Sequence, residues 1–128
     1  MLDACRRSGI SFVPFFPLES GLLTGKYRLG EAPPTGTRLA AWGERASSFI
    51  DDDRLRTVAA LTAFAEDRGR SMLELAMSWL VSNPLVATVI AGATKPEQVV
   101  ANVAASAWVL TPEDRAEVDA LTSAGHSP

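Results

Sequence analysis

Two loops in this sequence combine glycine, hydroxyl and lysine residues directly after an apolar stretch. The first is PFFPLESGLLTGKY, residues 14–27, and the second is AGATKPEQ, residues 91–98. Glycine lets a ligand approach the backbone closely, and the N–H groups at a helix start have no partner within the helix, so such loops can hold an anion. Each loop taken alone is better explained by turn and capping chemistry. The two loops together predict an anion site.

The established short motifs for nucleotide phosphates match neither loop. A P-loop has four residues between its glycines, and Ser or Thr follows its lysine to bind magnesium. Here three residues separate Gly21 from Gly25, and Tyr27 follows Lys26. The GxGxxG fingerprint of the Rossmann fold is also absent from the sequence. We therefore exclude both motifs.

The sequence offers no set of side chains for acid–base, nucleophilic or metal chemistry. Its single histidine, His126, belongs to a C-terminal tail that is expected to fray, and Cys5 is more typical of a small buried residue than of a nucleophile. The acidic residues 51–53 indicate a helix start rather than a metal site. The tryptophans are expected to anchor the core or an interface: Trp42, Trp79 and Trp108. We predict no catalytic residue and no metal.

The overall composition is that of one globular domain, residues 1–128. Of the 128 residues, 47% are hydrophobic and 21% are charged, which is ordinary for a domain with a buried core. The net charge is −3 and the basic residues are scattered, which argues against a nucleic-acid partner. A single cysteine, no signal peptide and no apolar run of roughly 18 residues predict a cytoplasmic protein that does not cross a membrane.

The first part of the chain reads as the end of a helix, a strand and a long connection. Residues 2–8 are expected to be helical, with Gly9 as a left-handed cap. Residues 10–16, ISFVPFF, predict a buried strand, and Pro14 should lie near its end because it has no backbone donor. The glycines and prolines of residues 21–52 predict a long, mobile connection.

Capping patterns predict the helices that follow. Residues 51–53 begin a helix that reaches about Asp67. The next helices start at these pairs: Ser71 with Glu74, Thr94 with Glu97, and Thr111 with Asp114. Residues 86–90 predict a second buried strand. The order is that of a parallel α/β sheet or barrel, but two strands cannot bury both their faces. We therefore expect a piece of a larger fold, or a protein that a partner completes.

Several separate stretches resemble the C-terminal portion of the aldo-keto reductase family. These stretches are ISFVPFFPLESGLLTGKY, GTR, ELAMSWLVSNP, VIAGATKPEQVVANV and LTPEDRAEVDAL, and they span nearly the whole chain. The resemblance is strongest to the branch with bacterial reductases and potassium-channel beta subunits. It implies a partial TIM (β/α)8 barrel, namely the last two βα units plus the C-terminal helix, with residues 10–16 and 86–90 as its seventh and eighth strands.

The resemblance also implies that the first loop holds part of an extended NADP(H). Phe15 matches the aromatic position that stacks on the nicotinamide ring. The residues matching the loop that wraps the diphosphate are Phe16, Pro17, Leu18, Ser20 and Gly21. Lys26 and Arg38 match basic positions that reach the phosphates. This placement agrees with the general rule that barrel phosphates lie at the loops after the last two strands.

The second loop is implied to hold the adenosine end. Gly92 and Thr94 match contacts near the 2′-phosphate, and Gln98 and Asn102 match the pair that holds the adenine edge. Three positions depart from the family pattern: Glu19 stands where a small residue is usual, Ala101 replaces a frequent Glu, and other branches carry Lys and Arg at positions 92 and 98. Lys95 could compensate. The resemblance thus favours NADPH over NADH.

The catalytic tetrad of the family, Asp, Tyr, Lys and His, lies on strands that this sequence does not contain. Tyr27 and Lys26 are on the wrong loop to replace it. The implied function is an NADP(H)-dependent oxidoreductase that reduces a small aldehyde or ketone, present here as its cofactor-binding part. The alternative is a non-catalytic nucleotide-binding module, or one that self-associates through exposed strand faces. A remnant without function is a third reading.

Overall fold

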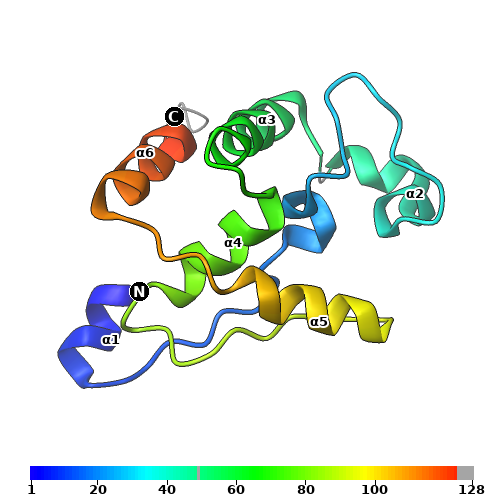
Figure 1. Cartoon of the computed structure of the whole chain (residues 1–128). Helices are drawn as coiled ribbons and strands as arrows, with labels where there is room; N and C mark the ends of the chain where they lie inside the picture. Colours follow the sequence, from blue (N-terminus) through cyan, green and yellow to red (C-terminus); the bar gives the residue numbers. More distant parts are fainter. Residues whose placement is uncertain (49, 124–128) are drawn as a thin grey trace.

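The computed structural model describes residues 1–48 and 50–123, and helices dominate them (Figure 1). The elements are α1 (Leu2–Ser8), η1 (Glu19–Thr24), α2 (Arg38–Trp42), η2 (Gly43–Ser48), α3 (Asp52–Glu66), α4 (Met72–Val81), α5 (Pro96–Ala105) and α6 (Pro112–Ser123), where η marks a 3₁₀ helix. Helices α3, α4 and α6 form one packed group, while α5 and two extended segments lie on the other side of α4 (Figure 1).

Most of the predicted helix boundaries are confirmed by their capping contacts. Asp51 accepts a 2.7 Å hydrogen bond from the Arg54 N–H and begins α3. At α4 the bonds are reciprocal: the Glu74 N–H donates to Ser71 Oγ at 3.2 Å, and the Ser71 N–H donates to Glu74 Oε2 at 2.8 Å. Gly9 ends α1 with φ 64°, a conformation that glycine adopts at little cost.

The start of α5 differs from the prediction by one residue. Lys95, and not Thr94, is the residue before the helix, and Gln98 replaces Glu97 as the side chain that folds back. The reason is Pro96, which lacks an N–H group and therefore fits best at the first helical position. The third helical position then falls on Gln98, whose Oε1 accepts from the Lys95 N–H at 3.2 Å.

The main core lies between α3, α4 and α6. Its fully or nearly buried members are Leu61, Phe64, Ala65, Met72, Leu75, Ala76, Leu110 and Val118, and Trp79 and Trp108 pack against them. Ser78, which is completely buried, joins this core to the end of α5. Its hydroxyl donates to the Ala105 carbonyl at 2.9 Å and accepts from the Trp108 N–H at 3.1 Å.

The connection over residues 21–52 is more structured than predicted, since it contains most of η1 and all of α2 and η2. A second cluster of buried residues holds it against α3: Leu22, Tyr27, Leu39, Ala46, Leu55 and Val58. Trp42 packs on this cluster, and Thr37 Oγ1 accepts from the Ala40 N–H to begin α2. The expectation of a plain loop failed because widely spaced apolar residues show no periodicity in the sequence.

The two predicted strands are paired in parallel, but only through isolated bridges among the described residues. The bridges join Phe12 with Val86 and Phe15 with Ile90. The hydrogen bonds that hold the pairing are Phe12 N–H to Leu85 C=O at 2.7 Å, Ala87 N–H to Phe12 C=O at 3.1 Å, and Ile90 N–H to Pro14 C=O at 3.4 Å. Pro14 donates none in return, which shortens the ladder.

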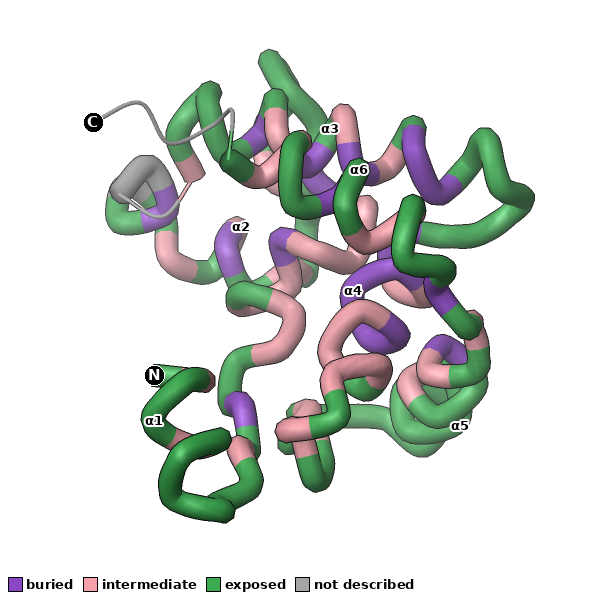
Figure 2. The backbone as a smooth tube through the Cα atoms, turned by 90° about the vertical axis from the view of Figure 1, so that its left-hand side faces the viewer, coloured by how far each residue is buried: buried purple, intermediate pink, exposed green. Residues whose placement is uncertain are grey.

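The prediction that these strands are buried is wrong for this structure. Phe15 is 74% exposed, Ile90 61% and Ile10 60%, and Figure 2 shows how little of the two segments and of α1 and α5 is buried. Cys5, expected in the interior, is only partly buried. A strand in a parallel sheet is buried because both faces of the sheet are covered by other elements. Here the exposed side chains show that the paired segments lack such cover on one face.

Candidate functional site

The parallel pairing places both candidate loops at the same edge of the paired segments. Bridges at Phe12–Val86 and Phe15–Ile90 run in the same direction, so the chain leaves both segments side by side. Residues 16–21 continue from the first segment and residues 91–98 from the second. In Figure 1 the second trace runs on to the side where α5 begins, whereas the first turns toward α4 and into η1 near the middle of the molecule. The two loops thus start side by side, although they lie 70 residues or more apart in sequence.

The first loop has an unusual backbone. Phe16, Glu19 and Ser20 have φ angles of 56°, 44° and 57°, and they are the only non-glycine residues with positive φ in the described part of the chain. Such conformations are rare outside glycine and gather at ligand sites. The loop also closes on itself: the Gly21 N–H donates to the Leu18 carbonyl at 2.8 Å, and the Glu19 N–H donates to the Phe16 carbonyl.

Gly21, Lys26 and Tyr27 form a small cradle within this loop. A Cβ atom at Gly21 would lie 3.0 Å from Lys26 Nζ and 3.7 Å from the Tyr27 hydroxyl, so the Lys26 ammonium can lie this close to the backbone only because residue 21 is glycine. The Tyr27 hydroxyl is buried and has no hydrogen-bond partner among the described residues. Of these groups, the ammonium of Lys26 is the one that an anion could reach, because Lys26 is exposed and Tyr27 is buried.

Arg38 reaches the same neighbourhood through the packing of its helix. It is the first residue of α2, it is exposed, and α2 packs against η1. The next residue, Leu39, is 1% exposed and shares the second core cluster with Leu22 and Tyr27. Lys26 closely follows η1 and Arg38 begins α2, so the two predicted basic residues lie at the ends of two elements that pack together.

Phe15 presents an open aromatic surface at the edge of the paired segments. Its ring is held edge-to-face against Phe16, with 5.2 Å between ring centroids. Because Phe15 remains 74% exposed, it can offer a ring face for stacking. Pro17 and Leu18, the next residues, are partly buried and turn the chain into η1.

The second loop is open, and one of its predicted ligand residues is already engaged. A Cβ atom at Gly92 would meet nothing within 4 Å. Gln98 Oε1 accepts hydrogen bonds from the Thr94 N–H at 2.7 Å, the Thr94 hydroxyl at 3.2 Å and the Lys95 N–H. Its amide NH₂ group is the part of Gln98 suited to bind a base edge, one turn before the partly buried Asn102.

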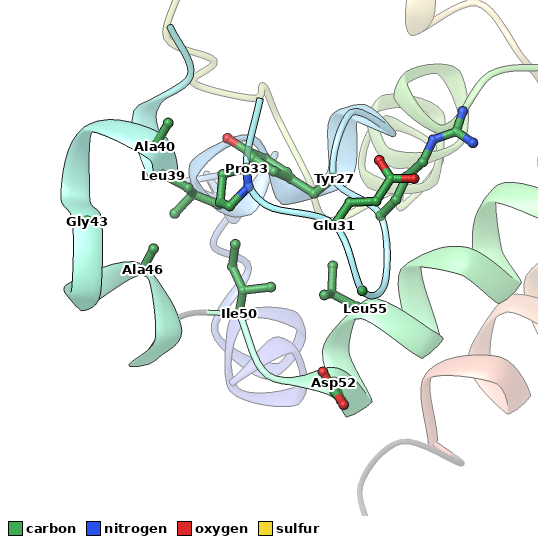
Figure 3. Close-up of a pocket in the computed structure, with 12 residues that line it drawn as sticks. Tyr27, Glu31, Pro33, Leu39, Ala40, Gly43, Ala46, Ile50, Asp52 and Leu55 are labelled. Carbon is green, nitrogen blue, oxygen red and sulfur yellow. The ribbon is translucent and has the colours of Figure 1, made fainter. Parts of the chain in front are cut away.

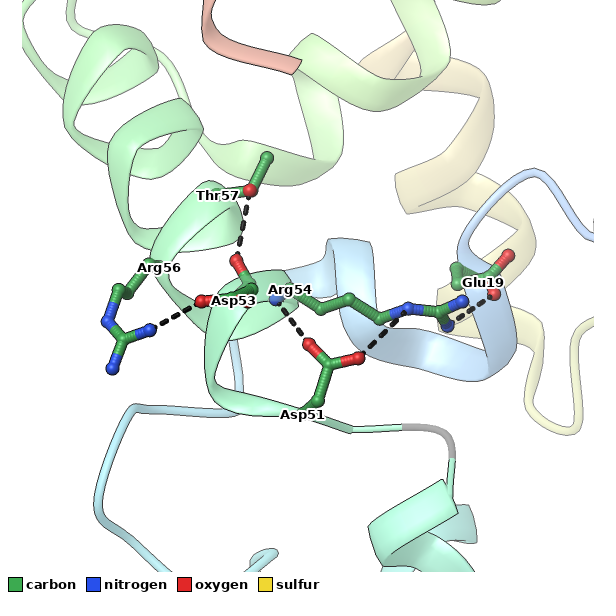
Figure 4. A network of polar contacts seen from close by, with 6 residues as sticks. All are labelled: Glu19, Asp51, Asp53, Arg54, Arg56 and Thr57. Carbon is green, nitrogen blue, oxygen red and sulfur yellow. Dashed lines mark hydrogen bonds and ion pairs between the residues drawn. The ribbon is translucent and has the colours of Figure 1, made fainter. Parts of the chain in front are cut away.

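Glu19, the departure from the family pattern, has a partner that the sequence did not suggest. Its carboxylate accepts from Arg54 Nη1 of α3 at 3.3 Å (Figure 4). Arg54 Nε also lies 3.8 Å from the Asp51 carboxylate. Sequence reasoning missed this pair because the two residues are 35 positions apart and no local spacing connects them.

Two hollows lie close to this region without joining the candidate residues. One, of about 530 Å³, is walled by Leu39, Ile50 and Leu55 beneath the long connection (Figure 3). The other, of about 730 Å³, runs between η1 and helices α3, α4 and α6. Of the predicted cofactor residues, only Pro17 lines either hollow. The candidate residues therefore lie mostly on the two loops and at the end of the paired segments, outside these hollows.

Three further predictions from the sequence concern a metal site, a membrane span and His126. Within residues 1–48 and 50–123, no three His, Cys, Asp or Glu side chains gather where they could hold a metal ion. None of the described helices is both long and apolar enough to cross a membrane. His126 lies outside the described residues, so the structure gives no test of its predicted lack of a role.

Comparison with known proteins decides the family. The model of the aldo/keto reductase family matches residues 1–123. The chain belongs to the aldo/keto reductase family. It is 39% identical over 116 residues to a probable voltage-gated potassium channel subunit beta of Oryza sativa subsp. japonica, and 32% identical over 124 residues to an L-glyceraldehyde 3-phosphate reductase of Escherichia coli O157:H7. These alignments cover 88% and 93% of this chain.

A solved aldo-keto reductase structure shares the fold. The glycerol dehydrogenase of Gluconobacter oxydans superimposes with a TM-score of 0.73 over 98% of this chain, at 24% sequence identity. This chain spans 38% of that protein and 35% of each of the two relatives named above. Aldo-keto reductases use nicotinamide cofactors, and relatives of this chain are named as oxidoreductases. The helices and paired segments described here thus correspond to about a third of such proteins.

Proposed function

We propose that this chain is the NADP(H)-binding C-terminal part of an oxidoreductase of the aldo-keto reductase type. The observation that carries the proposal is the parallel pairing of residues 12–15 with residues 86–90, which supports a dinucleotide bridging two neighbouring loops. Family membership supplies the reaction class, the reduction of a carbonyl to an alcohol. The bound cofactor would supply the hydride. In the intact protein the substrate would be a small aldehyde or ketone, and the setting cytoplasmic.

We assign roles to the residues according to what each can do chemically. Lys26 and Arg38 bring positive charge to the first loop, and the glycine at position 21 lets the Lys26 ammonium lie close to the backbone of that loop. Phe15 offers a ring face to a planar nicotinamide. The backbone of the loop is completed by these predicted residues: Phe16, Pro17, Leu18 and Ser20.

The second loop would hold the adenosine end. Gly92 leaves the backbone open to a phosphate, and Thr94 lies beside it with a hydroxyl. Gln98 and Asn102 present amide groups from one face of α5. Lys95 adds positive charge where a 2′-phosphate would lie, which favours NADPH over NADH in this proposal.

We further propose that the paired segments correspond to the seventh and eighth strands of a (β/α)8 barrel. Residues 10–16 and 86–90 would then each be followed by a helical layer, with α3 and α4 after the first and α5 after the second. The likeness in fold to a solved aldo-keto reductase supports this assignment. Their exposed apolar side chains would face the remaining strands of that barrel.

Fluorescence titration of the purified chain with NADPH tests the proposed site. We expect saturable binding that weakens with salt, because phosphate contacts are electrostatic, and weaker binding of NADH, which lacks the 2′-phosphate. The variant Arg38→Met should bind less tightly, whereas Arg7→Met, in α1, serves as a charge-matched control. No saturable binding at any salt concentration, in a chain shown to be folded by circular dichroism, would contradict the proposal.

The absence of the tetrad from this sequence predicts no turnover by the chain alone. Purified protein with NADPH and an aldehyde should show the same loss of absorbance as a blank without protein. The chemistry requires a group that protonates the carbonyl oxygen as hydride is transferred, and Tyr27 and Lys26 lie on the wrong loop to take that role by the family pattern. Aldehyde-dependent oxidation of NADPH above the blank would contradict this assignment.

A second candidate function is that of a module that assembles with another copy of itself. The observation in its favour is the exposure of apolar side chains along both extended segments: Ile10, Val13, Phe15, Phe16 and Ile90. Strand faces left uncovered pair readily with other chains. Light scattering over a range of concentrations should then show a discrete oligomer that Ile90→Glu converts to monomer. A monomer at every concentration would dismiss this candidate.

A further inference from the structure

Glu19 places a negative charge inside the loop proposed to hold the diphosphate. It lies between Leu18 and Ser20, and its φ of 44° is one of the positive values that give the loop its shape. A carboxylate within a few ångströms of a phosphate opposes binding, because like charges repel strongly when partly shielded from water. The position of the Glu19 carboxylate therefore affects how tightly the loop can bind a phosphate.

The structure directs the Glu19 carboxylate toward α3. Arg54 Nη1 lies 3.3 Å from Glu19 Oε1, and both side chains are about half exposed. Figure 4 shows the Arg54 guanidinium reaching from α3 to η1, with Asp51 on its other side. Lys26, by contrast, has its ammonium over Gly21. The acidic and the basic side chain of the loop thus have different partners.

Without Arg54, the surroundings of Glu19 on this side would be acidic. Glu19, Asp51, Asp53 and Arg54 all line the same hollow between η1 and α3. Asp53 is paired with Arg56, whose other partner is Asp52 within the same helix. The carboxylates at the start of α3 would repel Glu19, and repulsion from α3 favours rotamers in which Glu19 turns back over the loop.

We propose that Arg54 is a positioning residue for NADP(H): its ion pair with Glu19 holds the carboxylate against α3 and away from the phosphates of the dinucleotide. This inference rests on the proposed function, since it concerns the same loop. Arg54 need not touch the cofactor. It acts through Glu19, and its effect on affinity depends on Glu19 being charged.

Four variants of the chain test the inference by NADPH fluorescence titration at low salt. Arg54→Met should raise the Kd about three- to tenfold, the size expected of an unscreened charge pair near the surface. Arg56→Met removes the same charge from the same helix but not from Glu19, and should change the Kd by less than about twofold. Glu19→Gln should bind at least as tightly as the parent chain. In Glu19→Gln/Arg54→Met the affinity should return to within about twofold of the Glu19→Gln variant.

The double variant is the decisive one. If it binds as weakly as Arg54→Met, then Arg54 acts on the ligand or on α3 and not through Glu19, and the inference is overturned. An Arg54→Met variant with unchanged affinity also overturns it. The defect of Arg54→Met should shrink at high salt, whereas a folding defect would persist and appear in circular dichroism. If the parent chain binds no NADPH at all, the proposed function fails first and this inference falls with it.

Discussion

The helical group of α3, α4 and α6 and the pair of extended segments differ sharply in how completely they are packed. Ala65 and Leu75 in the helical group are 0% and 2% exposed. Phe15 and Ile90 in the paired segments are 74% and 61% exposed, although both have large apolar side chains. The first region buries these side chains almost completely, although a hollow lies beside it, whereas the second leaves large apolar side chains exposed.

This difference indicates how stability and binding are divided in the molecule. Apolar burial, the main stabilising term in folding, is concentrated in the helical group. The candidate binding loops begin at the ends of the exposed segments. The elements that follow them, η1 and α5, both pack on α4. The helical group would therefore act as a scaffold that can fold while the cofactor side remains open.

The largest expected effect comes from truncating the core of the helical group. Leu75→Ala should lower the free energy of unfolding by about 2–5 kcal/mol, because it removes buried methyl groups and leaves a cavity. Ile90→Ala should change it by less than about 0.5 kcal/mol, as for most exposed positions. Urea unfolding followed by circular dichroism measures both. Equal effects at the two positions would show that the paired segments are covered in solution.

A smaller effect is expected where the two regions are joined. Ser78→Ala should cost about 1–3 kcal/mol, since it leaves the Ala105 carbonyl and the Trp108 N–H without their partner in the interior. Ser106→Ala is the matched control, because the exposed Ser106 hydroxyl donates a local hydrogen bond to the carbonyl of Val103, three residues before it in the chain. Loss of stability in Ser106→Ala as large as in Ser78→Ala would argue against the buried bridge.

Local rules predicted the helical group well. The capping residues Asp51, Ser71 and Thr111 each occupy the predicted position, because a cap depends on residues three apart in the chain. Outside this group, the start of α5 was missed by one residue because of Pro96, which a stricter use of proline geometry would have found. Helix ends are thus predictable wherever the deciding contacts are local.

The exposed face and the loop contacts could not be predicted in the same way. ISFVPFF reads as a buried strand, yet burial depends on which other elements cover it, and that is not a property of the segment. The Glu19–Arg54 pair and the approach of Lys26 to Gly21 likewise depend on how the long connection folds back. The roles of the twelve predicted cofactor residues stay predictions until a ligand is bound.

The binding loops give the next prediction, which concerns affinity instead of stability. Lys26→Met should raise the Kd for NADPH about three- to tenfold while the free energy of unfolding stays within about 0.5 kcal/mol, because Lys26 is exposed. Lys26→Arg should retain part of the affinity. Titration and urea unfolding of the same samples separate the two effects. A large loss of stability in Lys26→Met would mean that the scaffold and the loop are not separable.

The smallest expected effect is the response of the helical group to acid. It concerns the ion pair between Arg68, just after α3, and Asp114 of α6. The pKa of Asp114 is lowered from its ordinary value, first by the Thr111 N–H that donates to its carboxylate and then by Arg68, and these effects outweigh its burial. A carboxylate with a lowered pKa contributes stability that is fully present above its ordinary pKa and is lost as the pH falls through the folded value. The difference in stability between the parent chain and Asp114→Asn should therefore be largest near neutral pH and should shrink as the pH falls below about 4. Urea midpoints measured from pH 7 to pH 3 test this, and a difference that stays constant over that range would show that Asp114 acts by its shape and hydrogen bonds and not by its charge.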